Sequence, residues 1–460
     1  MAHPSIQNDT IESERLLTEF RGGRKYFRMT ALHFVIAILF AFLFFYMLFA
    51  TNKPARLNPV IFVPGDGGSQ VEARLNKTET VHYICDKTTS NWFTLWLNLE
   101  LLVPEVIDCF IDNLRLVYNN IDNLRLVYNN VTRTTSNSPG VDIRIPGFGR
   151  SASVEWLDPF VRVGSYFSYI AAALVGLGYQ RDLSMRGAPY DFRKAPNENQ
   201  EYFANFKALI EETYDLNGGT PVVLVAHSMG SLMCLYFLQR QSSAWKSKFV
   251  RSLVSLAAPW GGSVKAVKVF AVGDDLGVYV LSKSTLKMYQ ITCPSTSWLL
   301  PSEHFWKADE VIVQTTEKNY TITNMKEYFD DLGYTQGWEM RKDVAQYALD
   351  FRPPGVEVHC LHGSRVSTPG KLVYAKNKFP DSPQYVMDDG DGTVNLRSLQ
   401  GCLAWSAKQA QPVNHMVFPG ADHMTILSDK NMLAYMANLL RLKTEDEGNL
   451  FQNLLGIFFY

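Results

Sequence analysis

The segment AHSMG at 226–230 places a serine between an apolar run and a glycine. Where a serine acts as a nucleophile, the backbone turns sharply from a strand into a helix, so the residues two before and two after must be small. The usual pattern has glycine at both places, and here Ala226 replaces the first, adding only one methyl group. The run 221–226 predicts a buried strand and 229–241 predicts a helix. This setting favours Ser228 as a nucleophile over a polar residue that merely ends a strand.

A serine hydroxyl needs a base to take its proton and a carboxylate to orient that base. In parallel α/β folds the acid and then the histidine follow the serine, each after a later strand. Asp391 lies between two glycines after a predicted strand, and His423 follows the last predicted strand. Asp388 and Asp389 compete for the acid role, but the flanking glycines favour Asp391 because they let the backbone carry its side chain inward. Together with Ser228 these residues indicate acyl transfer through a serine ester.

Two backbone N–H groups must then stabilise the oxyanion that forms during attack. One is expected from Met229, directly after the serine, and the other from the glycine-rich turn at 64–68, where we favour the amide of Asp66. A phosphate-binding loop is the competing interpretation of this turn. The turn lacks the Lys-Ser/Thr pair that such a loop uses.

The elements that must position these residues alternate between predicted strands and predicted helices. The strand-like runs lie at 58–63, 141–147, 221–226, 250–259, 356–363, 384–392 and 414–423, and the helical runs at 163–178, 197–216, 229–241 and 424–442. This alternation predicts βαβ units and a mostly parallel sheet in an α/β fold. Residues 264–351 lose the rhythm and are interpreted as an inserted cap subdomain, which leaves 53–80, 141–263 and 352–460 as the core.

The composition fits a globular enzyme better than a nucleic-acid-binding protein. The 460 residues are 47% apolar, enough for a large buried core with insertions. The net charge of −1 provides no basic field for a phosphate backbone, so we expect no nucleic acid partner.

An apolar run from Ala31 to Ala50 has no Lys, Arg, Asp or Glu and follows a basic stretch. It is long enough to span a bilayer, and its long basic head favours a signal anchor over a cleaved signal peptide. Residues 1–52 are therefore interpreted as a cytosolic tail with a transmembrane anchor at about 31–50, and the rest of the chain as lumenal or extracellular. Secretion after cleavage of a signal peptide is the alternative.

The cysteines and glycosylation motifs agree with that placement. Cys85 with Cys109, and Cys360 with Cys402, would each close a loop in an oxidising compartment. That would leave Cys234 and Cys293 unpaired, but six cysteines allow 15 pairings and the spacing does not decide among them. Candidate N-glycosylation sites lie at Asn76, Asn130 and Asn319.

Two features between residues 85 and 130 have open interpretations. Trp92, Phe93 and Trp96 lie in an irregular apolar stretch that either belongs to the core or forms a patch for a membrane or an acyl chain. The segment IDNLRLVYNN occurs at 111–120 and again at 121–130. Either one copy is looped out of the fold or the gene model contains an error, and we assign the repeat no function.

Nine segments resemble the family of lecithin:cholesterol acyltransferase and the lysosomal phospholipase A2 (group XV phospholipase A2). They are VPGDGGSQVEARL (63–75), CFIDNLRLVYN (109–119), PGVDIRIPGFG (139–149), GAPYDFR (187–193), VLVAHSMGSL (223–232), LAAPWGGS (256–263), PGVEVHCLHG (354–363), DGDGTV (389–394) and GADHM (420–424). The resemblance extends over about 58–442 and is far more specific than any one motif.

The resemblance implies an α/β-hydrolase that cleaves the acyl ester of glycerophospholipids through Ser228, with Asp391 and His423 completing the triad. The acyl chain would pass to water or to a lipid alcohol at a phospholipid membrane or lipoprotein surface, with no metal and no cofactor. In having aspartate at position 66, the sequence resembles the lysosomal members of the family, whereas the plasma enzyme has cysteine at this place in the turn. A carboxyl group beside an oxyanion is easier to accommodate when protonated, so Asp66 suggests acidic working conditions and a lysosomal or secretory location.

The resemblance also implies the pairs Cys85–Cys109 and Cys360–Cys402. The first would bracket a lid and membrane-binding subdomain at 81–140, and Trp92, Phe93 and Trp96 would then contact the membrane or the acyl chain. Two other functions remain open. One is acyl transfer to a sterol or diacylglycerol as the main activity, and the other is a non-catalytic lipid-binding or lipid-transfer protein on the same fold.

Overall fold

The computed structural model describes residues 38–43, 57–117, 133–158, 164–275, 283–345, 347 and 350–440. Residues 57–443 form one compact unit, and 1–56 with 444–460 form a second, of which only the helical residues 38–43 are described. Most of the predicted anchor, the second copy of the decapeptide and Asn130 thus lie outside the described residues. None of the helices in the described part of the chain has the length and apolar character that crossing a bilayer requires.

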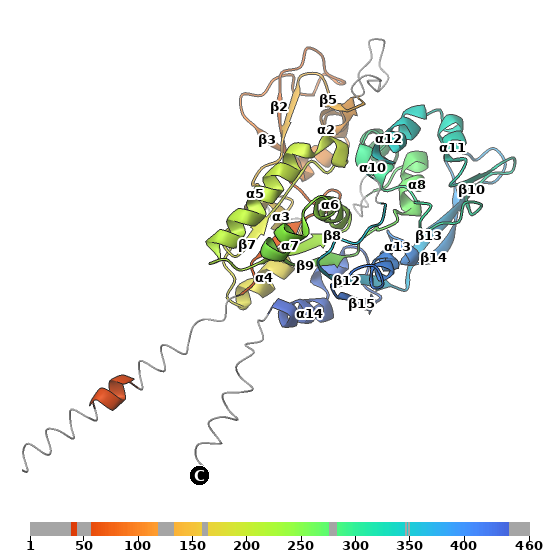
Figure 1. Cartoon of the computed structure of the whole chain (residues 1–460). Helices are drawn as coiled ribbons and strands as arrows, with labels where there is room; N and C mark the ends of the chain where they lie inside the picture. Colours follow the sequence, from red (N-terminus) through yellow and green to blue (C-terminus); the bar gives the residue numbers. More distant parts are fainter. Residues whose placement is uncertain are drawn as a thin grey trace, which may run out of the picture. The chain divides into compact units, whose positions relative to one another are not determined.

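The centre of the 57–443 unit is a six-stranded sheet in the order β15-β12-β9-β8-β1-β7 (Figure 1). Its strands are β1 (Val60–Val63), β7 (Met185–Gly187), β8 (Val222–His227), β9 (Val250–Leu256), β12 (Glu357–Ser364) and β15 (Val413–Pro419). Every neighbouring pair is parallel. All residues of β1 and β8 are buried, as expected for strands covered on both faces. The predicted α/β fold with a parallel sheet is confirmed.

The helices and the short 3₁₀ segments lie between and around these strands. The α-helices are α2 (Ile107–Leu114), α3 (Ala152–Glu155), α4 (Ser168–Gly176), α5 (Gln200–Leu216), α6 (Met229–Leu238), α7 (Ser243–Phe249), α8 (Val264–Val272), α9 (Lys283–Gln290), α10 (Pro294–Trp298), α11 (Met325–Asp331), α12 (Thr335–Ala345), α13 (Leu396–Leu399) and α14 (Lys430–Leu440). The 3₁₀ segments are η1 (Leu99–Leu102), η2 (Pro196–Glu198), η3 (Gln400–Trp405) and η4 (Thr425–Ser428). Helix α6 packs against β1, β8 and β9, and all of its residues are buried, which explains why its sequence is apolar on every side.

A second, four-stranded sheet has the order β11-β10-β13-β14 and its own apolar core, shared with α8, α11 and α12 (Figure 1). Its strands are β10 (Val311–Gln314), β11 (Asn319–Thr321), β13 (Val366–Val373) and β14 (Gln384–Gly390). The strand predicted at 384–392 exists, but its expected place in the central sheet is wrong. It pairs antiparallel with β13, whose Leu372 is buried in the second core, so both strands belong to this smaller sheet.

A third sheet, in the order β3-β2-β6, carries the segment predicted to be the lid. It consists of β2 (Val71–Leu75), β3 (Phe93–Trp96) and β6 (Val141–Arg144), and a separate pair joins β4 (Leu116–Val117) to β5 (Ser136–Asn137). The described part of the first decapeptide copy forms the end of α2 and β4.

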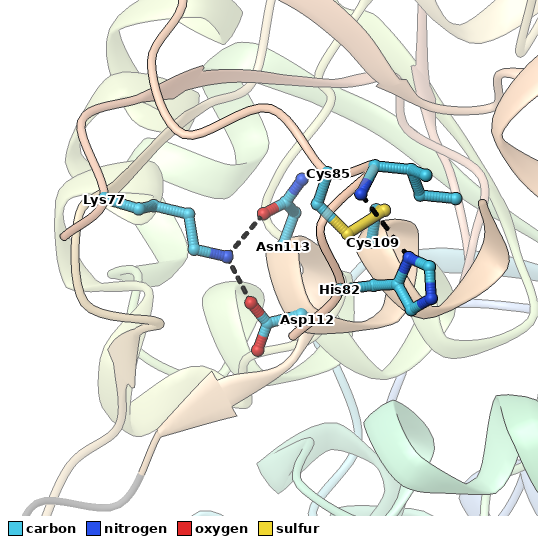
Figure 2. The surroundings of a disulfide bond; sticks show 7 residues. Lys77, His82, Cys85, Cys109, Asp112 and Asn113 are labelled. Atoms are coloured by element: carbon cyan, nitrogen blue, oxygen red, sulfur yellow. Dashed lines mark hydrogen bonds and ion pairs between the residues drawn. A yellow bond between two sulfur atoms is a disulfide. The ribbon is translucent and has the colours of Figure 1, made fainter. Parts of the chain in front are cut away.

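Both predicted disulfides are present. Cys85–Cys109 joins the loop after β2 to α2, and beside it Lys77 points toward Asp112 and Asn113 and donates hydrogen bonds to both (Figure 2). Cys360–Cys402 joins β12 to η3, while Cys234 and Cys293 are free and buried. Cys85–Cys109 therefore closes a loop within the lid segment, and Cys360–Cys402 ties η3 to a strand of the central sheet.

Candidate active site

Ser228 lies at the turn between β8 and α6 with a φ of 52°, a backbone conformation that side-chain-bearing residues rarely adopt. Its amide donates to the carbonyl of Leu256 at 2.8 Å, which holds the turn against β9. Gly230 cannot carry a side chain, because a Cβ there would lie 2.4 Å from the carbonyl oxygens of Val63 and Pro64. The predicted turn and its need for a small residue after the serine thus have a physical cause in the contact between α6 and the end of β1.

The structure brings together the three predicted side chains. His423 Nε2 lies 2.9 Å from Ser228 Oγ, and His423 Nδ1 lies 2.7 Å from Asp391 Oδ2. The His423 amide also donates to the Asp391 carbonyl at 2.9 Å. A backbone hydrogen bond and a side-chain hydrogen bond therefore both hold His423 against Asp391. With its Nδ1–H donated to the carboxylate, the imidazole presents Nε2 as the acceptor for the serine proton.

Asp391 is fully buried and accepts hydrogen bonds at Oδ1 from the amides of Thr393 and Val394, at 3.0 and 2.7 Å. Burial alone would raise the pKa of Asp391, but His423 and these two amides together lower it below its ordinary value. The competitors do not reach His423. Asp388 is exposed, and Asp389 accepts from the amide of Arg365 instead.

The two expected oxyanion donors lie at the turn after β1 and at the start of α6. A Cβ on Gly65 would lie 2.7 Å from Ser228 Cβ, which shows how closely this turn approaches the serine. The amides of Asp66 and Met229 donate no hydrogen bond to any acceptor within the described residues. Both are therefore available for a negatively charged oxygen.

The Asp66 carboxyl group opens into the same cavity as Ser228. Although the residue is exposed, the protein atoms packed around its carboxyl group partly bury the charge. That burial, reinforced by the charge of Asp274 and opposed by the Gly67 amide, Lys265 and His423, raises the pKa of Asp66 to about 6.

A cavity of about 230 Å³ lies next to Ser228 and has an apolar and a polar part. Apolar lining comes from Trp96, Leu157, Val269, Leu299 and Met424. Polar lining comes from Ser263, Lys265, Asp274, Gln290, Thr296 and Thr393. Lys265 and Lys268 both pair with Asp274, at 3.3 and 2.8 Å, so the polar part carries an ion-pair network. None of these polar residues has a sequence signal for a role in the site. Lys265, Asp274, Gln290 and Thr296 lie in the predicted cap, and Ser263 and Thr393 lie in segments quoted only for the family resemblance.

The three predicted lipid-contacting aromatics have different environments. Trp96 is 4% exposed, lines the cavity and donates its Nε1–H to the Gly67 carbonyl at 2.8 Å. The guanidinium groups of Arg74 and Arg144 both lie over the Trp92 ring, 5.1 and 4.5 Å from its centroid. Phe93 is half-buried against the main core. Of these, only Trp96 is placed where it could contact a substrate in the cavity.

A different set of apolar side chains in the lid segment is exposed. They are Val81, Tyr83, Ile84, Leu99 and Val103. Tyr83 is 88% exposed and Val81 52%, although large apolar side chains usually avoid water. These residues could not be predicted from the sequence, because the aromatic density of 92–96 is the stronger local signal.

The remaining predicted features are placed as follows. Asn76 and Asn319 are exposed, as glycosylation would require. Of the other histidines, His415 bonds to His362 at 2.8 Å, and His227 points away from the Ser228 hydroxyl toward Tyr166. Within the described residues there is no group of three or more His, Cys, Asp or Glu side chains arranged to hold a metal ion.

The parallel sheet, the strand-turn-helix at Ser228 and the order serine, acid, histidine define an α/β-hydrolase. The family model of lecithin:cholesterol acyltransferase matches residues 92–430, and the chain belongs to that family. It is 48% identical over 406 residues to a lysosomal phospholipase A and acyltransferase of Rattus norvegicus, covering 88% of this chain and 95% of that one, and 47% identical to the Homo sapiens protein with the same coverage. It is 38% identical to a phosphatidylcholine-sterol acyltransferase of Mus musculus, covering 83% of this chain and 85% of that one.

Proposed function

We propose that this protein removes a fatty acyl chain from a glycerophospholipid and passes it to water or to a lipid alcohol. The observation that carries the proposal is the hydrogen-bonded series Ser228–His423–Asp391, with distances of 2.9 and 2.7 Å, beside a partly apolar cavity. The names of the Rattus norvegicus and Homo sapiens relatives support the same substrate class and the same pair of reactions.

In the first half-reaction Ser228 Oγ attacks the ester carbonyl carbon while His423 Nε2 takes the hydroxyl proton. The carbonyl oxygen becomes negative and accepts from the amides of Asp66 and Met229. The ester C–O bond then breaks, His423 returns the proton to the departing lysophospholipid oxygen, and the acyl chain remains on Ser228.

In the second half-reaction a water or an alcohol occupies the place that the lysophospholipid left. His423 takes the acceptor's proton while the acceptor oxygen attacks the acyl carbon. The Ser228 ester bond then breaks, and His423 returns the proton to Ser228 Oγ to regenerate the hydroxyl. The product is a fatty acid when water attacks the acyl-enzyme. It is a new ester when an alcohol occupies the cavity and excludes water. Nothing in this sequence of steps requires a metal or a cofactor.

The acceptor is best tested by mass spectrometry of products from liposomes that contain phospholipid together with one candidate alcohol. We expect both free fatty acid and the acyl ester of a simple lipid alcohol, with more product at acidic than at neutral pH. Acyl ester formed from sterol or diacylglycerol in large excess over fatty acid would favour the second candidate, for which the 38% identical sterol acyltransferase is the supporting observation. No product of either kind would contradict the enzyme proposal and favour a non-catalytic lipid-binding protein.

The raised pKa of Asp66 predicts a loss of activity as the pH rises through about 6. The ionised carboxylate would repel the oxyanion, and one pH unit above the pKa about one molecule in ten remains protonated, so the rate should fall about tenfold. The same shift makes the folded state less stable as the pH rises from 3.8 through about 6. The Asp66→Asn variant stays neutral and should keep its rate at neutral pH. An unchanged pH profile in this variant would contradict the assignment.

The exposed apolar residues of the lid segment support membrane contact as the way to reach substrate. Replacing both Val81 and Tyr83 by serine should weaken liposome binding about tenfold or more, since each exposed apolar side chain that enters lipid contributes about 1–2 kcal/mol. Hydrolysis of a soluble short-chain ester should be unaffected. Tyr169→Ser is the matched control, because Tyr169 is 55% exposed on α4, outside the lid segment. Equal losses in both variants would argue against a specific membrane surface.

A lumenal location of the catalytic unit, in the lysosome or elsewhere in the secretory pathway, is part of the same proposal. Two disulfides in one domain are typical of an oxidising compartment, and the Rattus norvegicus and Homo sapiens relatives are named lysosomal. The proposal includes attachment of the catalytic unit to the membrane through the anchor at about 31–50. It also includes glycans at Asn76, Asn130 and Asn319.

A further inference from the structure

Tyr166 and His227 form a buried polar chain that the reaction steps above do not use. Tyr166 is 2% exposed and His227 1% exposed, and both lie in the wall of the cavity. The Gly65 amide donates to the Tyr166 oxygen at 2.9 Å, the Tyr166 hydroxyl bonds to His227 Nδ1, and His227 Nε2 bonds to the His423 carbonyl at 2.8 Å. The chain therefore begins at the oxyanion turn and ends at the backbone of the histidine that acts as the base.

Its two ends fix the direction of every hydrogen bond. The Gly65 N–H can only donate and the His423 carbonyl can only accept. His227 therefore carries its proton on Nε2 and accepts at Nδ1, so the Tyr166 hydroxyl must donate to Nδ1 while its oxygen accepts from Gly65. Each polar atom of the chain has a partner, and neither side chain has a free proton to exchange with Ser228.

The chain stays neutral over the range in which the enzyme would work. Burial, with the charge of His423 adding to it, lowers the pKa of His227 to about 3, and burial also raises the pKa of Tyr166. The groups that face the chain are His423, Asp391 and Asp66. Acidification that protonates exposed histidines therefore leaves the direction of these bonds unchanged.

The packing leaves the oxyanion turn little room to move. A Cβ on Gly68 would lie 2.6 Å from Tyr166 Cζ, and a Cβ on Gly65 would lie 3.0 Å from the Tyr166 hydroxyl oxygen. The turn therefore packs directly against the phenol ring of Tyr166. The next amide along the chain from Gly65 is that of Asp66, the expected oxyanion donor.

We propose that Tyr166 and His227 are positioning residues that couple the oxyanion turn at 64–68 to the backbone of His423. The proposal rests on the proposed roles of Ser228, His423 and Asp66, and it goes beyond them by assigning a joint task to two residues outside the triad. Loss of either link would let the Asp66 amide and the His423 ring shift independently, and misplacement of reacting groups by about 1 Å costs about 10²-fold in rate.

The test measures how fast a fluorophosphonate probe labels Ser228, alongside kcat and KM for phospholipid. We expect Tyr166→Phe and His227→Leu each to slow labelling about 10- to 100-fold and to lower kcat with little change in KM. The double variant should be no slower than the slower single variant, because both substitutions break one chain. His227→Gln, which can still accept from Tyr166 and donate to the His423 carbonyl, should recover most of the rate lost in His227→Leu.

Tyr179→Phe is the matched control, because Tyr179 is 3% exposed and its hydroxyl donates to the Asn58 carbonyl at 2.9 Å, at the start of β1. It should lower the thermal midpoint about as much as Tyr166→Phe but label at the wild-type rate. The proposal is overturned by wild-type labelling in Tyr166→Phe, by multiplying losses in the double variant, by a His227→Gln variant as slow as His227→Leu, or by an equally slow Tyr179→Phe variant. Because labelling needs no lipid, a wild-type protein that is labelled yet releases no acyl chain would contradict the proposed function alone.

Discussion

Replacing Ser228 by alanine should lower acyl release from phospholipid by roughly 10⁴-fold or more while leaving the fold intact. The hydroxyl forms the covalent bond in both half-reactions, and no other hydroxyl among the described residues is bonded to His423 Nε2. The residual rate would come from the oxyanion amides and from substrate binding. The measurement is fatty acid release from liposomes, with the thermal midpoint recorded for the same preparation.

Ser231→Ala is the matched control for this experiment. Ser231 is buried as well and lies in α6, but its hydroxyl donates to the Ala226 carbonyl at 3.3 Å instead of bonding to His423. This variant should retain acyl release close to the wild-type rate. If Ser228→Ala and Ser231→Ala lost activity equally, disturbance of the turn and not loss of a nucleophile would explain both.

Replacing Asp391 by asparagine should lower the rate by roughly 10⁴-fold, although the two side chains have nearly the same shape. An asparagine amide would donate to His423 Nδ1 and so force the ring proton onto Nε2. With a proton on it, Nε2 can no longer accept the proton of the Ser228 hydroxyl. Acyl release and fluorophosphonate labelling should fall together, because both need the serine proton removed.

Asp389→Asn provides the comparison for the acid, since Asp389 lies two residues earlier and bonds to the Arg365 amide instead of a histidine. It should change the rate by less than about threefold, as expected for a partly exposed carboxylate away from the reacting groups. A full loss in Asp389→Asn together with a nearly active Asp391→Asn would reverse the assignment of the acid.

Two residues of the candidate triad, Ser228 and Asp391, could be predicted because each has a local signal. Ser228 has small neighbours between a buried strand and a helix, and Asp391 has a glycine on each side. The sharp turn at the first and the inward direction at the second are properties of the backbone, so the sequence encodes them within a few residues.

Tyr166 could not be predicted in the same way. It precedes α4 in an apolar segment, and only the folded chain brings it to Gly65 and His227, which are 101 and 61 residues away. Strand β14 illustrates the same difficulty. Its residues predict a strand, but whether it joins the central sheet or pairs with β13 depends on long-range packing that periodicity does not contain.

Trp96 shows a third reason why prediction fails. A tryptophan in an apolar insertion fits a membrane patch and a cavity wall equally well, because the side chain is both large and amphipathic. In the structure its Nε1–H finds the Gly67 carbonyl and its ring closes the cavity, while smaller residues such as Val81 remain outside. The choice between these environments is made by the fold of the whole insertion.

The central claim is that Ser228 carries the acyl chain between donor and acceptor. The direct measurement is mass spectrometry of the protein after rapid acid quench of a reaction with phospholipid that bears an isotopically labelled acyl chain. The account predicts a labelled ester on the peptide that contains Ser228, formed before free fatty acid and lost when water or alcohol completes the reaction. Steady acyl release with no label on Ser228, or with the label on another residue, would contradict it.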